Sequence, residues 1–234
     1  MLDAAFDALK QYDWGTDLAA VKPIDDAVAT SHGNADARRA LEQRLIEALA
    51  SSISRDAKDY VCRKLAVVGS AAAVPTLAAL LPEADHSHMA RYALERIDGP
   101  EAAQALRDAL AKTDGKLKVG MLTSLGARRD AAAVGPIGGL LKDSDREVSR
   151  AAALALAAIG NAEAVSALEA SAPSVVGTNS PVNDALLACA ESLLATNQQA
   201  DALRVYKQLA DDRQSRLVRL AATRGLLACM SKTG

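Results

Sequence analysis

One pattern of residues recurs along this chain at intervals of 29, 31, 31, 37 and 33 residues. Each copy begins with a leucine, continues through small apolar residues to a turn, and then enters a second apolar stretch. The copies begin at Leu65, Leu94, Leu125, Leu156, Leu193 and Leu226. Regular spacing near 30 residues, with two helices in each unit, is typical of an α-solenoid. A single helix pair cannot bury its apolar surface alone, so we expect the copies to stack against one another.

The clearest copy spans residues 145–168. Ser144 is expected to cap its first helix, because Glu147 follows three residues later at the spacing of a capping box. Leu154 lies off the main apolar stripe, so this helix is expected to bury apolar groups on more than one side. The stripe itself has helical spacing and consists of Val148, Ala151, Ala152, Ala155, Leu156 and Ile159.

The same copy has a clear turn and a simpler second helix. Gly160 is expected to end the first helix in the left-handed conformation, which costs glycine little. The second helix shows a single stripe of Val165, Leu168 and Ala172. A thickly buried first helix beside a half-exposed second helix again predicts stacking between copies.

Composition supports helices over strands. The chain is 50% hydrophobic but only 3% aromatic, and alanine-rich sequences favour closely packed helices. We predict an all-α fold without strands, a right-handed α-solenoid of stacked antiparallel helix pairs. The prediction is a single domain over 1–234, with a divergent first unit at 1–50 and about five hairpins over 51–234. An insert at 171–181 precedes a helix that restarts at Pro181.

Three local features complete this prediction. Leu18 is placed in an apolar stripe of the first unit. Three glycines of the third copy (Gly135, Gly138 and Gly139) stand where another copy has alanine, and they either allow a close approach or weaken that helix. The cysteines are expected to be small buried hydrophobic residues, since they lie in apolar stripes without a CxxC motif: Cys62, Cys189 and Cys229.

Charge is unevenly distributed, although the net charge is only -2. Residues 1–36 hold seven Asp and two Lys, whereas residues 201–234 hold six or more basic groups and three Asp. The near-neutral balance gives no reason to expect nucleic acid, which usually needs a basic face. The two ends are either solvated surfaces or complementary ends that contact a neighbouring domain or subunit.

Targeting signals are not evident in the sequence. Asp3 and Asp7 follow Met1 closely, which is unlike a signal peptide. No apolar run approaches the 18 residues that suggest a membrane span. We therefore expect no membrane association, and a cytoplasmic protein if the chain is complete. The alternative is a module excised from a larger bacterial protein. A monomer or weak self-association is expected.

The repeat resembles the HEAT-like family, and most closely its short subtype found in phycobilisome lyases and many bacterial proteins. Its fingerprint is an acidic residue, Val-Arg, a run of small residues and Leu, then Ile-Gly and Val-x-x-Leu. The matching positions are Asp145, Val148, Arg150, Leu156, Ile159, Gly160, Val165 and Leu168, with Ser149 inserted between Val and Arg. Residues 218–219 repeat the Val-Arg pair. The resemblance covers about residue 35 to the end and implies the fold more strongly than any one function.

Chemical motifs are scarce. His86 and His88 form the closest histidine pair, but residues two apart on a helix do not share a face. We therefore expect an exposed helix start there and no metal site. Nucleophile-elbow, zinc-protease, P-loop and dinucleotide patterns are absent from the sequence. We predict no catalytic residues and no cofactor.

Binding is the favoured function, with a protein or peptide lying along the concave face of the second helices. The candidate contacts are Gln104, Arg107, Arg128, Arg129 and Arg204. Two alternatives follow from the family resemblance: a bilin lyase-like subunit that handles a chromophore, and a HEAT-like DNA glycosylase. The first needs an aromatic-lined pocket and the second a basic groove with stacking aromatic residues, and this sequence is poor in both features.

Overall fold

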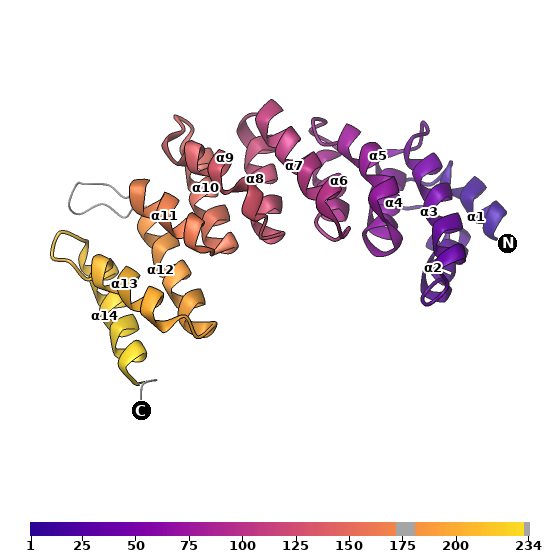
Figure 1. Ribbon diagram of the computed structural model, residues 1–234. Coiled ribbons are helices and arrows are strands. Elements are labelled where there is room, and N and C mark those ends of the chain that lie inside the picture. Colours follow the sequence, from indigo (N-terminus) through magenta and orange to yellow (C-terminus); the bar gives the residue numbers. More distant parts are fainter. Residues whose placement is uncertain (172–180, 232–234) are drawn as a thin grey trace. The chain divides into compact units, whose positions relative to one another are not determined.

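The computed structural model describes residues 1–171 and 181–231 (Figure 1). Over these residues the chain forms fourteen α-helices with short 3-10 turns and has no strand. This confirms the predicted all-α, solenoid-like fold. Contacts divide the chain into two compact units, Met1–Ser124 and Leu125–Gly234. The boundary lies inside helix α8 (Gly115–Ala127). The predicted single domain stays a prediction.

The first unit consists of helices that follow one another through short turns. Its elements are α1 (Leu2–Leu9), η1 (Leu18–Ala20), α2 (Lys22–Thr30), α3 (Ala35–Leu49), α4 (Arg55–Val68), η2 (Ala71–Ala73), α5 (Val74–Ala79), α6 (Ser87–Leu94) and α7 (Pro100–Lys112), followed by most of α8. Leu18 was predicted to be part of an apolar stripe. This is wrong, because its side chain is exposed in η1.

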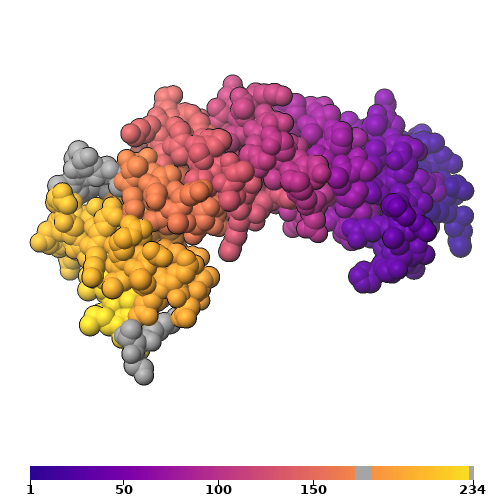
Figure 2. All heavy atoms as spheres, viewed as in Figure 1, coloured from indigo at the N-terminus to yellow at the C-terminus, as the bar shows by residue number. Residues whose placement is uncertain are grey.

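The second unit repeats the same plan. Its elements after α8 are η3 (Ala131–Ala133), α9 (Val134–Gly139), η4 (Leu140–Lys142), α10 (Arg146–Ile159), α11 (Ala162–Ser171), α12 (Pro181–Ala195), α13 (Gln199–Leu209) and α14 (Arg216–Ser231). Pro181 begins α12, as predicted. Most of the predicted insert, with Ala172, lies outside the described residues. Side chains fill the spaces between successive helices of each unit (Figure 2).

The recurring leucines coincide with helix pairs. The first five fall near the end of the first helix in the pairs α4–α5, α6–α7, α8–α9, α10–α11 and α12–α13, and the sixth lies in α14. First helices stack on first helices, as α4 does on α6 and α10 does on α12. Each first helix also contacts the second helix of its own pair, as α10 contacts α11.

Three of the turns share one backbone conformation. Arg129, Gly160 and Asn197 each stand four residues after the leucine that begins their copy, and each has a positive φ, of 52°, 64° and 66°. In the turns at Arg129 and Asn197, the next N–H donates to the carbonyl of that leucine at 3.1 and 2.8 Å. This left-handed residue reverses the chain while satisfying the last carbonyls of the helix. The prediction for Gly160 is confirmed.

Helix α10 corrects two predictions. Its N-cap is Asp145 and not Ser144: the Asp145 carboxylate accepts the N–H of Glu147 at 2.9 Å. Leu154 is 54% exposed, so it does not add a second buried side. The predicted stripe from Val148 to Ile159 is buried throughout.

Small residues allow helices of the second unit to approach closely. A Cβ on Gly126 would lie 3.0 Å from the Cα of Ala155 in α10. A Cβ on Gly225 would lie 2.3 Å from the Tyr206 ring, so only glycine fits there. Burial raises the pKa of Tyr206 to about 12, consistent with a ring held in an apolar contact. The alanine-rich composition thus serves close packing.

Polar side chains join one copy to the next in the first unit. Arg38 of α3 donates to the carbonyls of Val67 and Val68 at the end of α4, both at 2.9 Å. Glu42, one turn further along α3, is buried and accepts the N–H and hydroxyl of Ser70. These bonds satisfy both the last carbonyls of α4 and the turn that follows it. Each spans 28 to 30 residues, one repeat in length.

A second set joins α6 to α8. The Arg91 guanidinium donates to the carbonyl of Gly120 at 3.1 Å and lies 3.2 Å from the Ser124 hydroxyl. Ser124 in turn donates to Glu95 at 2.6 Å. Burial lowers the pKa of Arg91, while the nearby Glu95 opposes the shift. A Cβ on Gly120 would overlap the guanidinium, so this glycine makes room for the arginine.

In the second unit too, side-chain hydrogen bonds join one repeat to the next. Asn183 of α12 donates to the Gln214 side chain at 2.8 Å, and Gln199 of α13 donates to the carbonyl of Cys229 in α14. Arginines of the first helices differ in their partners. Arg91 of α6 reaches α8, one repeat further along, whereas Arg63 of α4 pairs with Asp59 of its own helix.

We predict that Glu42→Ala lowers the free energy of unfolding of the first unit by about 2 kcal/mol, because the Ser70 N–H loses a charged acceptor at a buried site. Glu47→Ala is the matched control on the same helix. It removes an exposed carboxylate that accepts from Gln43, and it should change stability by less than about 0.5 kcal/mol. Urea unfolding followed by circular dichroism measures both. An equal decrease in the free energy of unfolding in the two variants would contradict the role assigned to Glu42.

The glycine-rich helix α9 is short, at six residues, and continues into the 3-10 turn η4. A Cβ on Gly138 would meet Ala167 at an ordinary 3.5 Å, and Gly135 and Gly139 have nothing within 4 Å. The three glycines therefore permit no unusually close approach. Of the two predicted roles, a locally weak helix is the one that this geometry favours.

We therefore predict that Gly139→Ala stabilises the second unit by about 0.5–1 kcal/mol, because its backbone is already helical and the added Cβ meets open space. Amide hydrogen exchange at residues 134–142 should slow. Gly160→Ala serves as the control: its φ of 64° makes the same substitution destabilising. Faster exchange in Gly139→Ala would show that the glycine is needed there.

Candidate functional site

The side chains with nucleophilic or ligating chemistry lie apart from one another. Cys62, Cys189 and Cys229 are all buried, as predicted. Burial raises the pKa of the Cys62 thiol to about 12 and that of Cys189 to about 11. His86 lies at the start of α6, where its Nδ1 is 2.7 Å from the Glu83 carboxylate. Over the described residues, no group of three His, Cys, Asp or Glu is placed to hold a metal ion.

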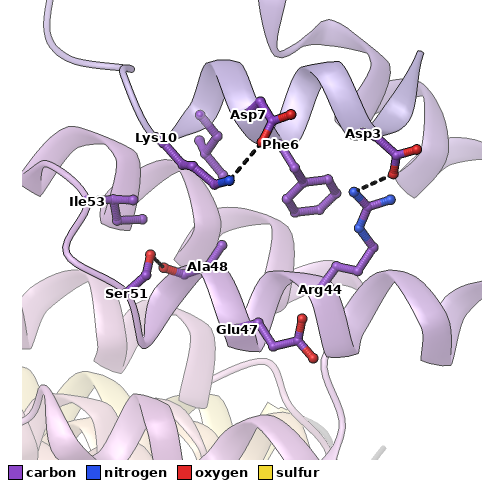
Figure 3. A pocket seen from close by; sticks show the side chains of 10 residues that line it. Asp3, Phe6, Asp7, Lys10, Arg44, Glu47, Ala48, Ser51 and Ile53 are labelled. Carbon is purple, nitrogen blue, oxygen red and sulfur yellow. Dashed lines mark hydrogen bonds and ion pairs between the residues drawn. The ribbon is translucent and has the colours of Figure 1, made fainter.

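A pocket lies between α1 and α3 in the first unit (Figure 3). Phe6 forms part of its wall, and the Arg44 guanidinium lies 4.2 Å from the ring centroid. Arg44 also pairs with Asp3 at 2.9 Å, and Lys10 with Asp7 at 2.7 Å. The Lys10 ammonium, through its hydrogen bond and its charge, lowers the pKa of Asp7.

This pocket is a weak candidate for a ligand site. Its volume of about 270 Å³ is below the range typical of small-molecule sites. The basic groups on its rim are engaged by neighbouring carboxylates of the same pocket. Its geometry is that of α1 packing on α3, with an Arg–Phe contact at the centre.

The predicted contact residues on the second helices are accessible, but they already form hydrogen bonds or ion pairs with neighbouring side chains. On α7, Gln104 donates to Asp108 at 2.7 Å and accepts from Arg107 at 2.6 Å. These residues line a shallow, open hollow. On α13, Arg204 pairs with Glu169 of α11, which ties two neighbouring second helices together. Arg107 belongs to the first unit and Arg204 to the second.

Arg128 and Arg129 lie in the turn after α8. Arg128 is half-buried, while Arg129 is exposed. Arg129 also holds the left-handed position that glycine or asparagine occupies in two other copies, a conformation that costs a β-carbon residue about 1–2 kcal/mol. A basic residue is thus presented at a turn where glycine would be easier to accommodate.

A different surface stands out on helix α14. Its inner side packs on α12 and α13 through Val218, Ala222, Gly225 and Cys229. Its outer side carries four large apolar side chains, each more than 60% exposed: Leu217, Leu220, Leu227 and Met230. Intervals of three, seven and three residues place these four on one side of the helix. We call this side the C-terminal face.

Two arginines belong to the same face. Arg216 and Arg224 precede and follow Leu220 by four residues each, so they lie beside the leucines on the helix surface. Both are exposed, and within residues 1–171 and 181–231 neither forms an ion pair. A cluster of exposed leucines beside arginines is unusual for a solvated surface and typical of a contact surface.

The sequence contained a signal for this face that our predictions did not use. Residues 216–231 are apolar on two opposite sides, whereas a helix at a free surface needs only one apolar side. None of the described helices is long and apolar enough to cross a membrane.

Comparison with known proteins bears on the repeat. Residues 108–176 match the family model of HEAT repeats. This chain carries HEAT-like repeats. The match begins in α7 and includes α8 to α11, which contain the copy from which the resemblance was drawn. The HEAT-like resemblance is confirmed, while the phycobilisome-lyase subtype stays a prediction. No curated protein matches the chain.

Solved structures give only distant likenesses. One engineered protein is 22% identical, over 97% of this chain and 68% of its own, with a TM-score of 0.44. A second engineered protein is 23% identical over 99% and 98%, with a TM-score of 0.38. Human deoxyhypusine hydroxylase, solved in complex with glycerol, is 16% identical over 88% and 96%, with a TM-score of 0.42. We base no functional argument on these three.

The buried cysteines lead to a prediction about reactivity. At pH 8 in native buffer, the thiols should react with a disulfide reagent at least about a hundredfold more slowly than in denaturant, because burial raises the pKa of Cys62 and Cys189 and blocks access. Absorbance of the released thiolate measures this. Rapid reaction of one equivalent of thiol in native buffer would identify an accessible cysteine and would support a nucleophilic role for it.

Proposed function

We propose that this HEAT-like repeat protein is a non-catalytic scaffold that binds another protein, and that the C-terminal face on α14 is its main contact surface. The observation that carries the proposal is the exposure of Leu217, Leu220 and Leu227 on one side of a helix whose other side is fully packed. Exposed contiguous apolar surface rimmed by polar residues is characteristic of protein contacts.

The apolar residues of this surface are particular to α14. When the copies are aligned on their recurring leucines, Leu217 and Leu220 of α14 correspond to charged residues of α10, and both of these, Glu147 and Arg150, are exposed. Burying an exposed leucine yields about 1.5–3 kcal/mol, so three leucines supply a substantial driving force for a partner helix or sheet.

The residues first predicted from the sequence make secondary contacts in this proposal: Gln104 and Arg107 in the first unit, and Arg128, Arg129 and Arg204 in the second. Arg204 is engaged by Glu169, and Gln104 by Asp108. A partner at these residues has to replace contacts that already exist, whereas a partner on the C-terminal face covers apolar surface that water now contacts. The secondary contacts therefore offer less net binding energy.

The proposal predicts a selective loss of binding in Leu220→Glu/Leu227→Glu. The tagged protein is used to capture partners from the lysate of its source, and the captured proteins are quantified by mass spectrometry. Bound partners should fall at least about tenfold, because two charges are placed in an apolar contact. Leu154→Glu is the matched control, since Leu154 is also an exposed leucine, on the first helix α10.

Three outcomes test the assignment of the binding surface. If the α14 variant loses its captured partners and Leu154→Glu retains them, the proposal is supported. If only Arg107→Ala/Arg204→Ala loses its captured partners, the binding surface lies on the second helices, which contradicts the assignment to α14. Capture of nothing above background by the wild-type protein contradicts a scaffold role in that lysate.

A further inference from the structure

The first unit carries a second exposed apolar site. The segment Asp13–Ala20 links α1 to α2 and is exposed along its length. Within it, Trp14 is 89% exposed and Leu18 is 56% exposed. We call this segment the N-terminal loop. An exposed tryptophan is costly in water and frequent at the centre of protein contacts.

Two carboxylates accompany these apolar groups. Asp13 accepts the N–H of Trp14 at 2.8 Å, and Asp17 accepts the N–H of Ala19 at 2.9 Å. Neither pairs with a cation in the part of the chain that the structure describes, whereas Asp3, Asp7, Asp25, Asp26 and Asp36 all do. The N-terminal loop therefore presents two apolar groups, each next to a carboxylate that has no cationic partner among the described residues.

The C-terminal face presents the reverse arrangement. Leu217 and Leu220 lie between Arg216 and Arg224 in the chain, and the exposed guanidinium groups of these two arginines have no carboxylate partner among the described residues. The two pairs of charges are thus opposite in sign.

We infer that the C-terminal face of one copy of this protein docks on the N-terminal loop of a second copy. The inference rests on the proposed function, since it names the partner of the surface proposed there. Trp14 and Leu18 would cover the leucines of α14, while Asp13 and Asp17 would neutralise Arg216 and Arg224. Because two different surfaces meet, the contact is heterologous and joins copies head to tail.

Paired charge reversals test this contact. We use the full chain and measure its mass by sedimentation velocity over a range of concentrations. The tail variant is Arg216→Glu/Arg224→Glu, and the head variant is Asp13→Lys/Asp17→Lys. The wild-type protein should associate as concentration rises. Each variant alone should weaken association at least about tenfold, because two attractive pairs become repulsive. Mixing the two variants should restore association, since opposite charges then face each other.

The control variants reverse exposed charges elsewhere: Asp108→Lys in α7 and Arg213→Glu in the turn before α14. They should associate as the wild type does. Circular dichroism checks that every variant is folded.

The other outcomes have defined meanings. A wild-type chain that stays monomeric at all concentrations overturns the inference. If capture from lysate still depends on Leu220 and Leu227, the proposed function survives with a different protein as the partner. Association that is lost only in the tail variant, and is not restored by mixing, also overturns the inference, because it indicates α14 docking on α14. Failure of both the capture and the association experiments overturns both proposals.

Discussion

The fold depends on contact between each helix pair and the next. One α-helical hairpin of about 30 residues buries too little apolar surface to be stable, so it requires a neighbour. Apolar packing provides most of that contact, with alanine and glycine allowing helices such as α8 and α10 to approach closely. Hydrogen bonds that reach one repeat along the chain fix the register, as Glu42 does with Ser70. These bonds use the turn and helix-end groups that would otherwise remain unpaired.

Much of this architecture could be predicted because it depends on local chemistry. The spacing of the leucines and the small residues before Gly160 are local signals, and the structure places helices and turns where they predict them. The cap of α10 was assigned one residue too early, since Ser144 and Asp145 are both good caps and only the backbone selects between them. The single domain that we predicted remains untested.

The contacts between repeats could not be predicted in the same way. Arg38 and Glu42 look like ordinary charged residues of an exposed helix, and only the neighbouring copy makes them partners of Val68 and Ser70 and buries Glu42. For the same reason the exposed side of α14 was not among the predicted contacts. Whether an apolar side is core or contact surface depends on what packs against it, and the leucines of α14 resemble core residues in the sequence. The basic turn at Arg129 was found correctly as an exposed feature, but its binding role stays a prediction.

The central claim is that α14 presents a contact surface on its outer side. Hydrogen–deuterium exchange measured across protein concentrations tests this claim most directly, because it reports where amides become protected without altering the sequence. We predict that raising the concentration protects residues 216–231 and residues 13–20 together, while α4, α6 and α10 exchange at unchanged rates. Protection confined to the second helices α7 and α13, with no change in α14, would contradict the account.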